Sequence, residues 1–152
     1  FATYTEDSGA YQRNMDRLIK KWNTSKNVVP APQVYQDKNK FENGILFFGT
    51  SQYACEEAMD MLKEKQIYTD AIRIKAFPFN QTVVNFINEH ERIFVIEQNR
   101  DAQMRSLLMI ELGANPQKLI SVLNYDGMPI TADNIVKQMA LTLEAKPVKA
   151  KI

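Results

Sequence analysis

Apolar residues recur every three or four positions near the start of the chain, which is the period of a helix with one apolar side. The pattern predicts a helix over residues 8–26, with basic residues between the apolar ones. The apolar positions are Tyr11, Met15, Leu18, Ile19 and Trp22. Pro30 and Pro32 follow and end the helical pattern, because proline lacks an amide hydrogen. We therefore expect a leading helix and a proline-containing linker over residues 1–32.

From Gly44 onward, short apolar runs alternate with stretches of helical period. The runs predict strands at residues 45–48, 71–74, 93–96 and 119–123, each followed by a helix, with a further short strand at Val34 and Tyr35. The second of these helices is short and carries the apolar residues Val83, Val84 and Ile87. Short strands that are apolar throughout are typical of a parallel sheet covered on both faces. The pattern predicts a three-layer α/β/α sandwich over residues 33–144 and a flexible basic tail over residues 145–152.

The composition fits one globular domain, with 152 residues of which 45% are hydrophobic and 24% charged. Nineteen Lys and Arg balance eighteen Asp and Glu, so no nucleic-acid-binding or membrane-binding surface is predicted. Cys55 is the only cysteine, which excludes an internal disulfide and a four-cysteine iron–sulfur site and favours a reducing, cytoplasmic setting. The chain begins with Phe1 and lacks a signal-peptide pattern, so we expect a piece of a longer protein.

The glycines form neither of the common nucleotide-binding motifs, G-x-G-x-x-G or G-x-x-x-x-G-K-[ST]. One turn remains of interest, at Gly49, Thr50 and Ser51, between a predicted strand and its helix. A glycine permits a tight turn there, and the amides at the helix N-terminus could hold a phosphate or carboxylate. The alternative is that Thr50 or Ser51 serves only as a helix N-cap.

Isolated reactive residues offer little support for catalysis. His90 is the only histidine, so no second histidine can share a metal with it, and we expect it at the surface or in a turn. Cys55 lies in the first turn of a predicted helix, where it is either a reactive thiol or a packing residue, and packing is favoured. The spacing of Ser51, His90 and Asp126 does not support a catalytic triad. No metal site is predicted.

The densest polar run follows the third long strand, at the carboxyl edge where open α/β sheets bind ligands or partners. Its residues are Glu97, Gln98, Asn99, Arg100, Asp101, Ala102 and Gln103. The alternative interpretation is a solvated loop with Asp101 as a helix N-cap. Because Glu97 directly continues an apolar strand, we expect it to be partly buried and to have a polar partner.

Four segments together resemble a known family. They are Gly49-Thr50-Ser51, residues 72–79 (IRIKAFPF), residues 95–103 (VIEQNRDAQ) and Tyr125-Asp126-Gly127. They are similar to the C-terminal domain of the alpha subunit of 2-oxoacid:ferredoxin oxidoreductases, with the 2-oxoglutarate branch favoured over the pyruvate branch. The similarity extends over residues 5–143, and residues 14–17 and 29–32 resemble the link from the thiamine-binding domain.

The resemblance implies a fold and an assembly. The fold is transketolase C-terminal-like, with five strands in the order 1-3-2-4-5 and strand 1 antiparallel. The intact enzymes decarboxylate a 2-oxoacid on thiamine diphosphate, pass electrons through iron–sulfur clusters to ferredoxin and release an acyl-coenzyme A. Thiamine diphosphate, magnesium and the clusters bind elsewhere, so no catalytic or cofactor-binding residue is expected in this chain. The implied partners are the remaining alpha-subunit domains and the beta subunit, with ferredoxin and coenzyme A for the whole enzyme.

The implied strand order places a crevice at the carboxyl edge of the sheet, where connections leave in opposite directions. Thr50, Ser51, Gln98, Asn99 and Arg100 would line it. We expect this edge either to dock against the rest of the enzyme or to contact an anionic group of coenzyme A or substrate, and docking is favoured.

The alternative from another functional class is a stand-alone module that binds a small anion. The two hypotheses differ in the surface they require. A domain cut from a larger enzyme should expose apolar surface, with Phe1, Tyr11 and Trp22 as candidates, whereas a free module should not.

Overall fold

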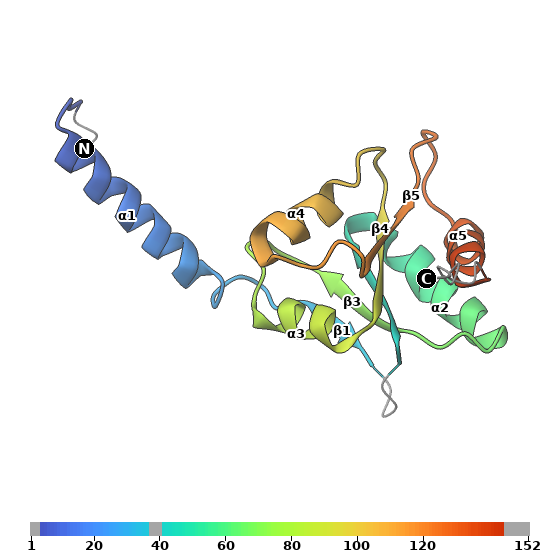
Figure 1. Cartoon of the computed structure of the whole chain (residues 1–152). Helices are drawn as coiled ribbons and strands as arrows, with labels where there is room; N and C mark the ends of the chain where they lie inside the picture. Colours follow the sequence, from blue (N-terminus) through green and yellow to red (C-terminus); the bar gives the residue numbers. More distant parts are fainter. Residues whose placement is uncertain (1–3, 37–40, 145–152) are drawn as a thin grey trace, which may run out of the picture.

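One mixed sheet forms the centre of the computed structural model, which describes residues 4–36 and 41–144 (Figure 1). The strands are β1 (Gln33–Tyr35), β2 (Asn43–Phe48), β3 (Asp70–Ile74), β4 (Arg92–Glu97) and β5 (Leu119–Leu123). The helices are α1 (Ser8–Ser25), the short η1 (Gly49–Ser51), α2 (Gln52–Glu64), α3 (Gln81–Glu89), α4 (Gln103–Leu112) and α5 (Ala132–Glu144). Each long predicted strand and helix is present, and their ends differ from the predicted ones by a few residues.

The sheet has the strand order β1-β3-β2-β4-β5. β1 runs antiparallel to β3, with Val34 opposite Ile72, whereas the other neighbouring strands are parallel. Leu46 in β2 lies between Ile72 of β3 and Val95 of β4. The predicted five-stranded mixed sheet, its order and its antiparallel first strand are therefore confirmed.

Helices cover both faces of the sheet, because successive side chains of each strand point to opposite faces. Ile45 and Phe47 belong to the cluster with α2 and α5, whereas Leu46 belongs to the cluster with α3 and α4. Within α3 the buried residues are Val83, Phe86 and Ile87, and Val84 is only partly buried. The three-layer arrangement predicted from the apolar strands is confirmed.

Gly44 is required by packing at the start of β2. A Cβ atom at this position would lie 2.8 Å from both Ile93 Cδ1 and Phe86 Cε1. Real Cβ atoms do not come so close to neighbouring carbons, so the absence of a side chain lets α3 and β4 pack directly against the backbone of β2.

The leading helix α1 extends away from the sheet and its covering helices (Figure 1). Asp7 begins it by accepting a hydrogen bond from the amide of Gly9 at 2.8 Å. None of its 18 residues is buried.

Phe1 and the predicted tail at residues 145–152 lie outside the described residues. Among those that are described, no helix is both long and apolar enough to cross a membrane.

Candidate interface at the carboxyl edge of the sheet

Gln98 joins three loops at the carboxyl edge of the sheet. Its Nε2 donates to Thr50 Oγ1 at 3.1 Å and to Ser51 Oγ at 3.2 Å, and both hydroxyls lie in η1 after β2. Its Oε1 accepts from the amide of Ile130, on the approach to α5, at 3.2 Å. The structure therefore brings Thr50, Ser51 and Gln98 together as predicted, and the amide of Gln98 uses the two hydroxyls of the turn.

Glu97 faces the N-terminus of α4. Its carboxylate is fully buried and accepts from the amides of Met104 at 2.7 Å and Arg105 at 3.0 Å. The side chain of Asn99 donates to the same carboxylate at 2.8 Å. A carboxylate is favourable at this end of a helix, where unpaired amides point outward. The predicted burial and polar partnering of Glu97 are confirmed, and the amides that could hold an external anion at α4 are taken.

Asn99 shapes the loop before α4, because its Oδ1 accepts from the amides of Asp101 at 3.1 Å and Gln103 at 3.3 Å. The alternative interpretation, in which Asp101 is the helix N-cap, is wrong. The N-cap position is Ala102, with φ of 49°, and its side chain makes no capping bond. Because the long Glu97 side chain reaches the helix amides from β4, the capping position needs no polar residue.

Arg100 lies apart from the hydrogen bonds of Gln98. Its side chain is 75% exposed, and Nε donates to Asp101 Oδ1 at 2.7 Å. An exposed pair of adjacent residues contributes little to stability because water screens it. The guanidinium therefore remains accessible at the edge, with a carboxylate beside it.

A hollow of about 670 Å³ opens at the same edge. Its lining residues are Thr50, Gln98, Asn124, Tyr125, Gly127, Met128, Pro129 and Ile130. None of these side chains is cationic, and the nearby carboxylate of Asp126 accepts from Asn124 Nδ2 at 3.2 Å and from the amide of Met128 at 2.9 Å. The walls of the hollow are therefore partly polar and partly apolar, and none of its lining side chains carries a positive charge that could neutralise a phosphate.

The structure contradicts the N-cap interpretation of Ser51 in the Gly49-Thr50-Ser51 turn. Ser51 occupies the N-cap position of α2, but its side chain makes no capping hydrogen bond and accepts from Gln98 instead.

Cys55, one turn further on, is fully buried in the core. Burial, followed by the nearby Glu56 carboxylate, raises the pKa of its thiol from 9.0 to about 12. The favoured packing role of Cys55 is confirmed.

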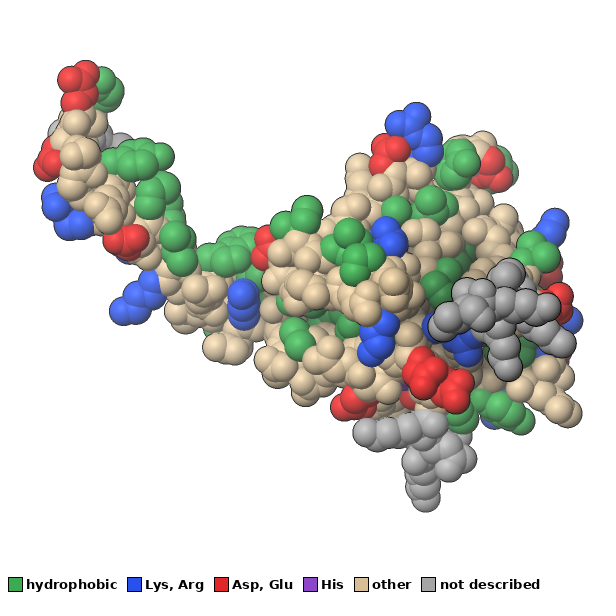
Figure 2. All heavy atoms as spheres, viewed as in Figure 1, with side chains coloured by type: hydrophobic (Ala, Val, Ile, Leu, Met, Phe, Trp, Pro, Cys, Tyr) green, Lys and Arg blue, Asp and Glu red, His purple; other side chains and the backbone are tan. Residues whose placement is uncertain are grey.

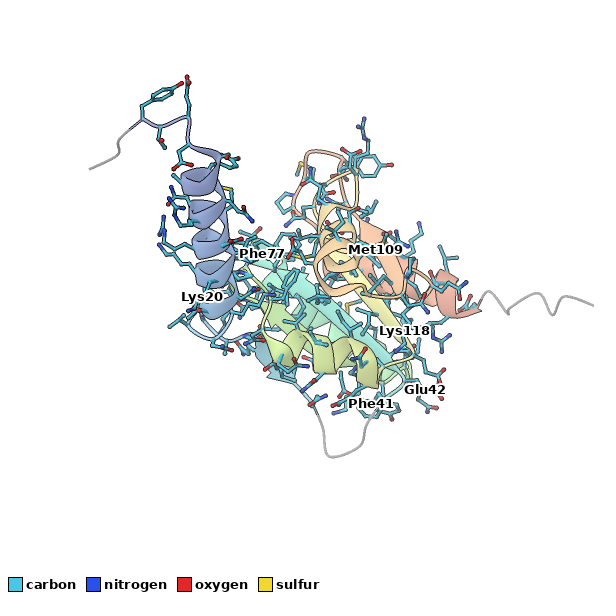
Figure 3. All side chains as sticks on the ribbon, turned by 60° about the vertical axis from the view of Figure 1, so that its left-hand side comes forward. Lys20, Phe41, Glu42, Phe77, Met109 and Lys118 are labelled. Atoms are coloured by element: carbon cyan, nitrogen blue, oxygen red, sulfur yellow. The ribbon has the colours of Figure 1, made fainter. Side chains whose placement is uncertain are left out.

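His90 lies in the connection between α3 and β4, but it is buried, so the expected surface location is wrong. Its Nδ1 donates to the carbonyl of Phe86 at 2.6 Å, and its Nε2 lies 3.0 Å from Asp70 Oδ2. The same Asp70 oxygen accepts from the amide of Phe41 at 3.3 Å. Figure 3 shows Phe41 beside Glu42 at this end of the sheet. The feature of the sequence that could have indicated a buried partner for His90 is Asp70, an acidic residue at the start of an apolar strand.

The buried histidine also lies far from the other members of the triad weighed above. His90 precedes β4, whereas Ser51 follows β2 and Asp126 follows β5. Because β2, β4 and β5 are parallel, His90 is at the amino edge and the other two residues are at the carboxyl edge. The three side chains cannot act together, in agreement with their spacing in the sequence.

No protein-family model and no curated protein matches the sequence. Among solved structures, the chain is similar to 2-oxoglutarate:ferredoxin oxidoreductase from Magnetococcus marinus with 2-oxoglutarate, coenzyme A and succinyl-CoA bound. The TM-score is 0.79 at 18% identity, over 92% of this chain and 24% of that one. It is also similar to the alpha chain of a probable 2-oxoacid ferredoxin oxidoreductase from Thermoplasma acidophilum, with a TM-score of 0.50 at 22% identity, over 74% of this chain and 97% of that one.

This chain has the fold of these two oxidoreductase chains. Both bear the name of the family that the sequence resembles, and the first is named for 2-oxoglutarate. The chain spans about a quarter of the length of the Magnetococcus protein, at 24%. Because α1 makes up 18 of the 152 residues, a match over 92% of the chain must include part of this projecting helix.

Proposed function

We propose that this chain is the transketolase C-terminal-like domain of the alpha subunit of a 2-oxoglutarate:ferredoxin oxidoreductase. The intact enzyme converts a 2-oxoacid and coenzyme A to an acyl-coenzyme A, carbon dioxide and reduced ferredoxin, and this domain is structural and forms subunit interfaces. The observation that carries the proposal is the fold match to the Magnetococcus enzyme over 92% of the chain. It agrees with the family that four separate segments of the sequence resemble.

The reactive side chains of the described residues support a role outside catalysis. Both ring nitrogens of His90 are used by neighbours in the core, and the Cys55 thiol is buried with a raised pKa. Cys55 cannot supply the several thiolates of an iron–sulfur cluster. Within residues 4–36 and 41–144, no group of three or more His, Cys, Asp and Glu side chains could hold a metal ion. These residues do not fit the family's cofactors, so we place thiamine diphosphate, magnesium and the clusters in other parts of the enzyme.

The carboxyl edge is the surface we assign to docking. The candidate residues for this interface remain Thr50, Ser51, Glu97, Gln98, Asn99, Arg100 and Gln103. The uncharged hollow and the use of the α4 amides by Glu97 favour docking against the remaining alpha-subunit domains or the beta subunit over binding an anion of coenzyme A. Tyr125 and Met128, which are both exposed beside the hollow, supply apolar contact area for such a partner.

A stand-alone anion-binding module is the second candidate, and the exposed surface of α1 argues against it. Tyr11 is 67% exposed and Trp22 is 42% exposed, as expected for a domain whose neighbour covers them. The single cysteine of this chain is consistent with the cytoplasmic setting that we propose for the enzyme.

Activity of the complete enzyme tests the proposal. The full-length subunit that contains this chain, co-expressed with its beta subunit, should reduce ferredoxin in the presence of 2-oxoglutarate and coenzyme A, and more slowly with pyruvate. The isolated chain should show neither turnover nor heat of binding with thiamine diphosphate and magnesium. Absence of reduction with every 2-oxoacid, from an assembled and cofactor-loaded enzyme, would overturn the assignment.

The role of the carboxyl edge is tested by Arg100→Glu in that same enzyme. Lys63→Glu is the matched control, because Lys63 lies exposed in the last turn of α2, away from this edge. Docking predicts that only R100E weakens subunit assembly, measured by native mass spectrometry. A raised KM for coenzyme A with intact assembly would instead make the edge a ligand site, and no change in either measurement would rule out both roles.

A further inference from the structure

The α1 stripe, which we define as Tyr11, Met15, Leu18, Ile19 and Trp22, is an apolar surface whose side chains are all at least 36% exposed. Four of these positions are spaced by four, three and four residues, which aligns them along one side of a helix. Figure 2 shows hydrophobic side chains in a row along one side of α1, with basic side chains away from that row. Most helical stability in proteins comes from packing of an apolar face, and α1 has no buried residue.

The stripe continues onto the body of the domain through aromatic contacts. The ring of Trp22 lies edge-on to Phe77 at 5.1 Å, and Phe77 lies edge-on to Phe79 at 5.1 Å. Phe79 is buried in the core with α3 and α4, whereas Phe77 is 39% exposed. Figure 3 shows Phe77 where α1 meets the rest of the domain. The last turn of α1 is thus attached to the core, and its earlier turns present the stripe to a partner.

The charges of α1 select among possible partners. Within the helix Arg13, Arg17, Lys20 and Lys21 stand against a single acidic residue, Asp16. Asp7, just before the helix, pairs with Arg13 at 3.9 Å, and both side chains are mostly exposed. A second copy of this chain would bring two basic helices together, which is unfavourable. A surface whose apolar centre is bordered by carboxylates complements both the stripe and its charges.

The Magnetococcus enzyme indicates where such a surface is located. The match to that protein includes part of α1 and covers 24% of its length, so at least part of α1 has a counterpart in a chain of which most lies outside the match. We propose that the α1 stripe and Phe77 dock onto an apolar, carboxylate-bordered surface of the remaining part of the alpha subunit. This inference rests on the function proposed above and names the partner of one further surface.

Hydrogen exchange compares α1 in two states of the protein. In the isolated chain the amides of α1 should exchange quickly, and in the full-length subunit they should exchange at least about tenfold more slowly, because opening then requires separation from the partner surface. Leu18→Glu should remove this protection. Asn23→Glu is the matched control, since it makes the same change of charge in the same helix at a position outside the stripe.

A second measurement keeps a folding defect separate from a docking defect. Neither variant should change the thermal unfolding of the isolated chain, because α1 contributes no buried residue, whereas L18E alone should lower the Tm of the full-length subunit. Rapid exchange of α1 in the full-length subunit would overturn docking, and a dimer of the isolated chain that L18E dissociates would identify a second copy as the partner.

The outcomes also separate this inference from the proposed function. An active 2-oxoglutarate:ferredoxin oxidoreductase with an unprotected α1 would leave the function standing and remove the docking surface. A protected α1 in a subunit that oxidises no 2-oxoacid would support the docking surface and overturn the proposed function.

Discussion

The buried carboxylate of Glu97 gives the most direct test of how this fold is stabilised. Glu97→Gln keeps the shape of the side chain but replaces one acceptor oxygen with an NH₂ group. The carboxylate accepts from Met104 N, Arg105 N and Asn99 Nδ2, at 2.7–3.0 Å. In the variant, one oxygen can still accept, while the new NH₂ group must face a donor in a site that excludes water.

The magnitude follows from the bonds that are lost. A hydrogen bond to a charged group contributes about 1.5–3 kcal/mol net, and an unpaired buried donor costs about 1–3 kcal/mol. The favourable interaction with the helix N-terminus involves the same amides, so we do not add it separately. We expect E97Q to lower the free energy of unfolding by about 3 kcal/mol, which corresponds to a Tm decrease of roughly 6–12 °C for a domain of this size.

Urea unfolding followed by far-UV circular dichroism measures this loss. Tryptophan fluorescence is unsuitable, because Trp22 lies in α1 and contacts the body through Phe77. Glu111→Gln is the matched control. Glu111 is exposed in the last turn of α4, the helix whose N-terminal amides bind Glu97, and removal of a negative charge at a helix C-terminus is neutral or slightly favourable. A difference below about 0.5 kcal/mol between the two variants would refute the assignment, because it is within the range of ordinary surface substitutions.

Three further predictions concern the core. Asp70→Ala removes a buried partner of His90 and should lower the free energy of unfolding in urea by about 3–5 kcal/mol. The control Glu42→Ala breaks an exposed ion pair and should lower it by at most about 1 kcal/mol. Equal losses in the two variants would contradict the buried pair. Gly44→Ala should cost about 1–3 kcal/mol in the same assay because its new methyl group overlaps two side chains, and an unchanged midpoint would contradict that packing. Burial raises the pKa of Cys55 from 9.0 to about 12, so in this range the folded state keeps a proton that the unfolded state loses, and Tm should fall as pH rises from 9 towards 12. The decline of Tm should be shallower in Cys55→Ala. Parallel plots of Tm against pH for the two proteins would contradict the raised pKa.

The elements of this fold could be predicted because local sequence encodes them. The spacing of apolar residues located α1, because positions three and four apart share one side of a helix. Continuous short apolar runs located the strands of the parallel sheet, because such strands are buried on both faces. The strand order was predicted from the resemblance to a family and not from periodicity, because an alternation of strands and helices is compatible with several orders.

Only the tertiary structure determined the partners of the polar residues. Gln98 meets Thr50 across 48 positions of sequence, and His90 meets Asp70 across 20. The sequence indicated that Glu97 must find a partner, because it continues a buried strand, but the partner could be any donor near the end of β4. The folded chain places the α4 amides there. Sequence alone therefore predicted which groups would need a partner, while the packing of the elements decided where each partner would be, because these contacts join residues that no local pattern relates.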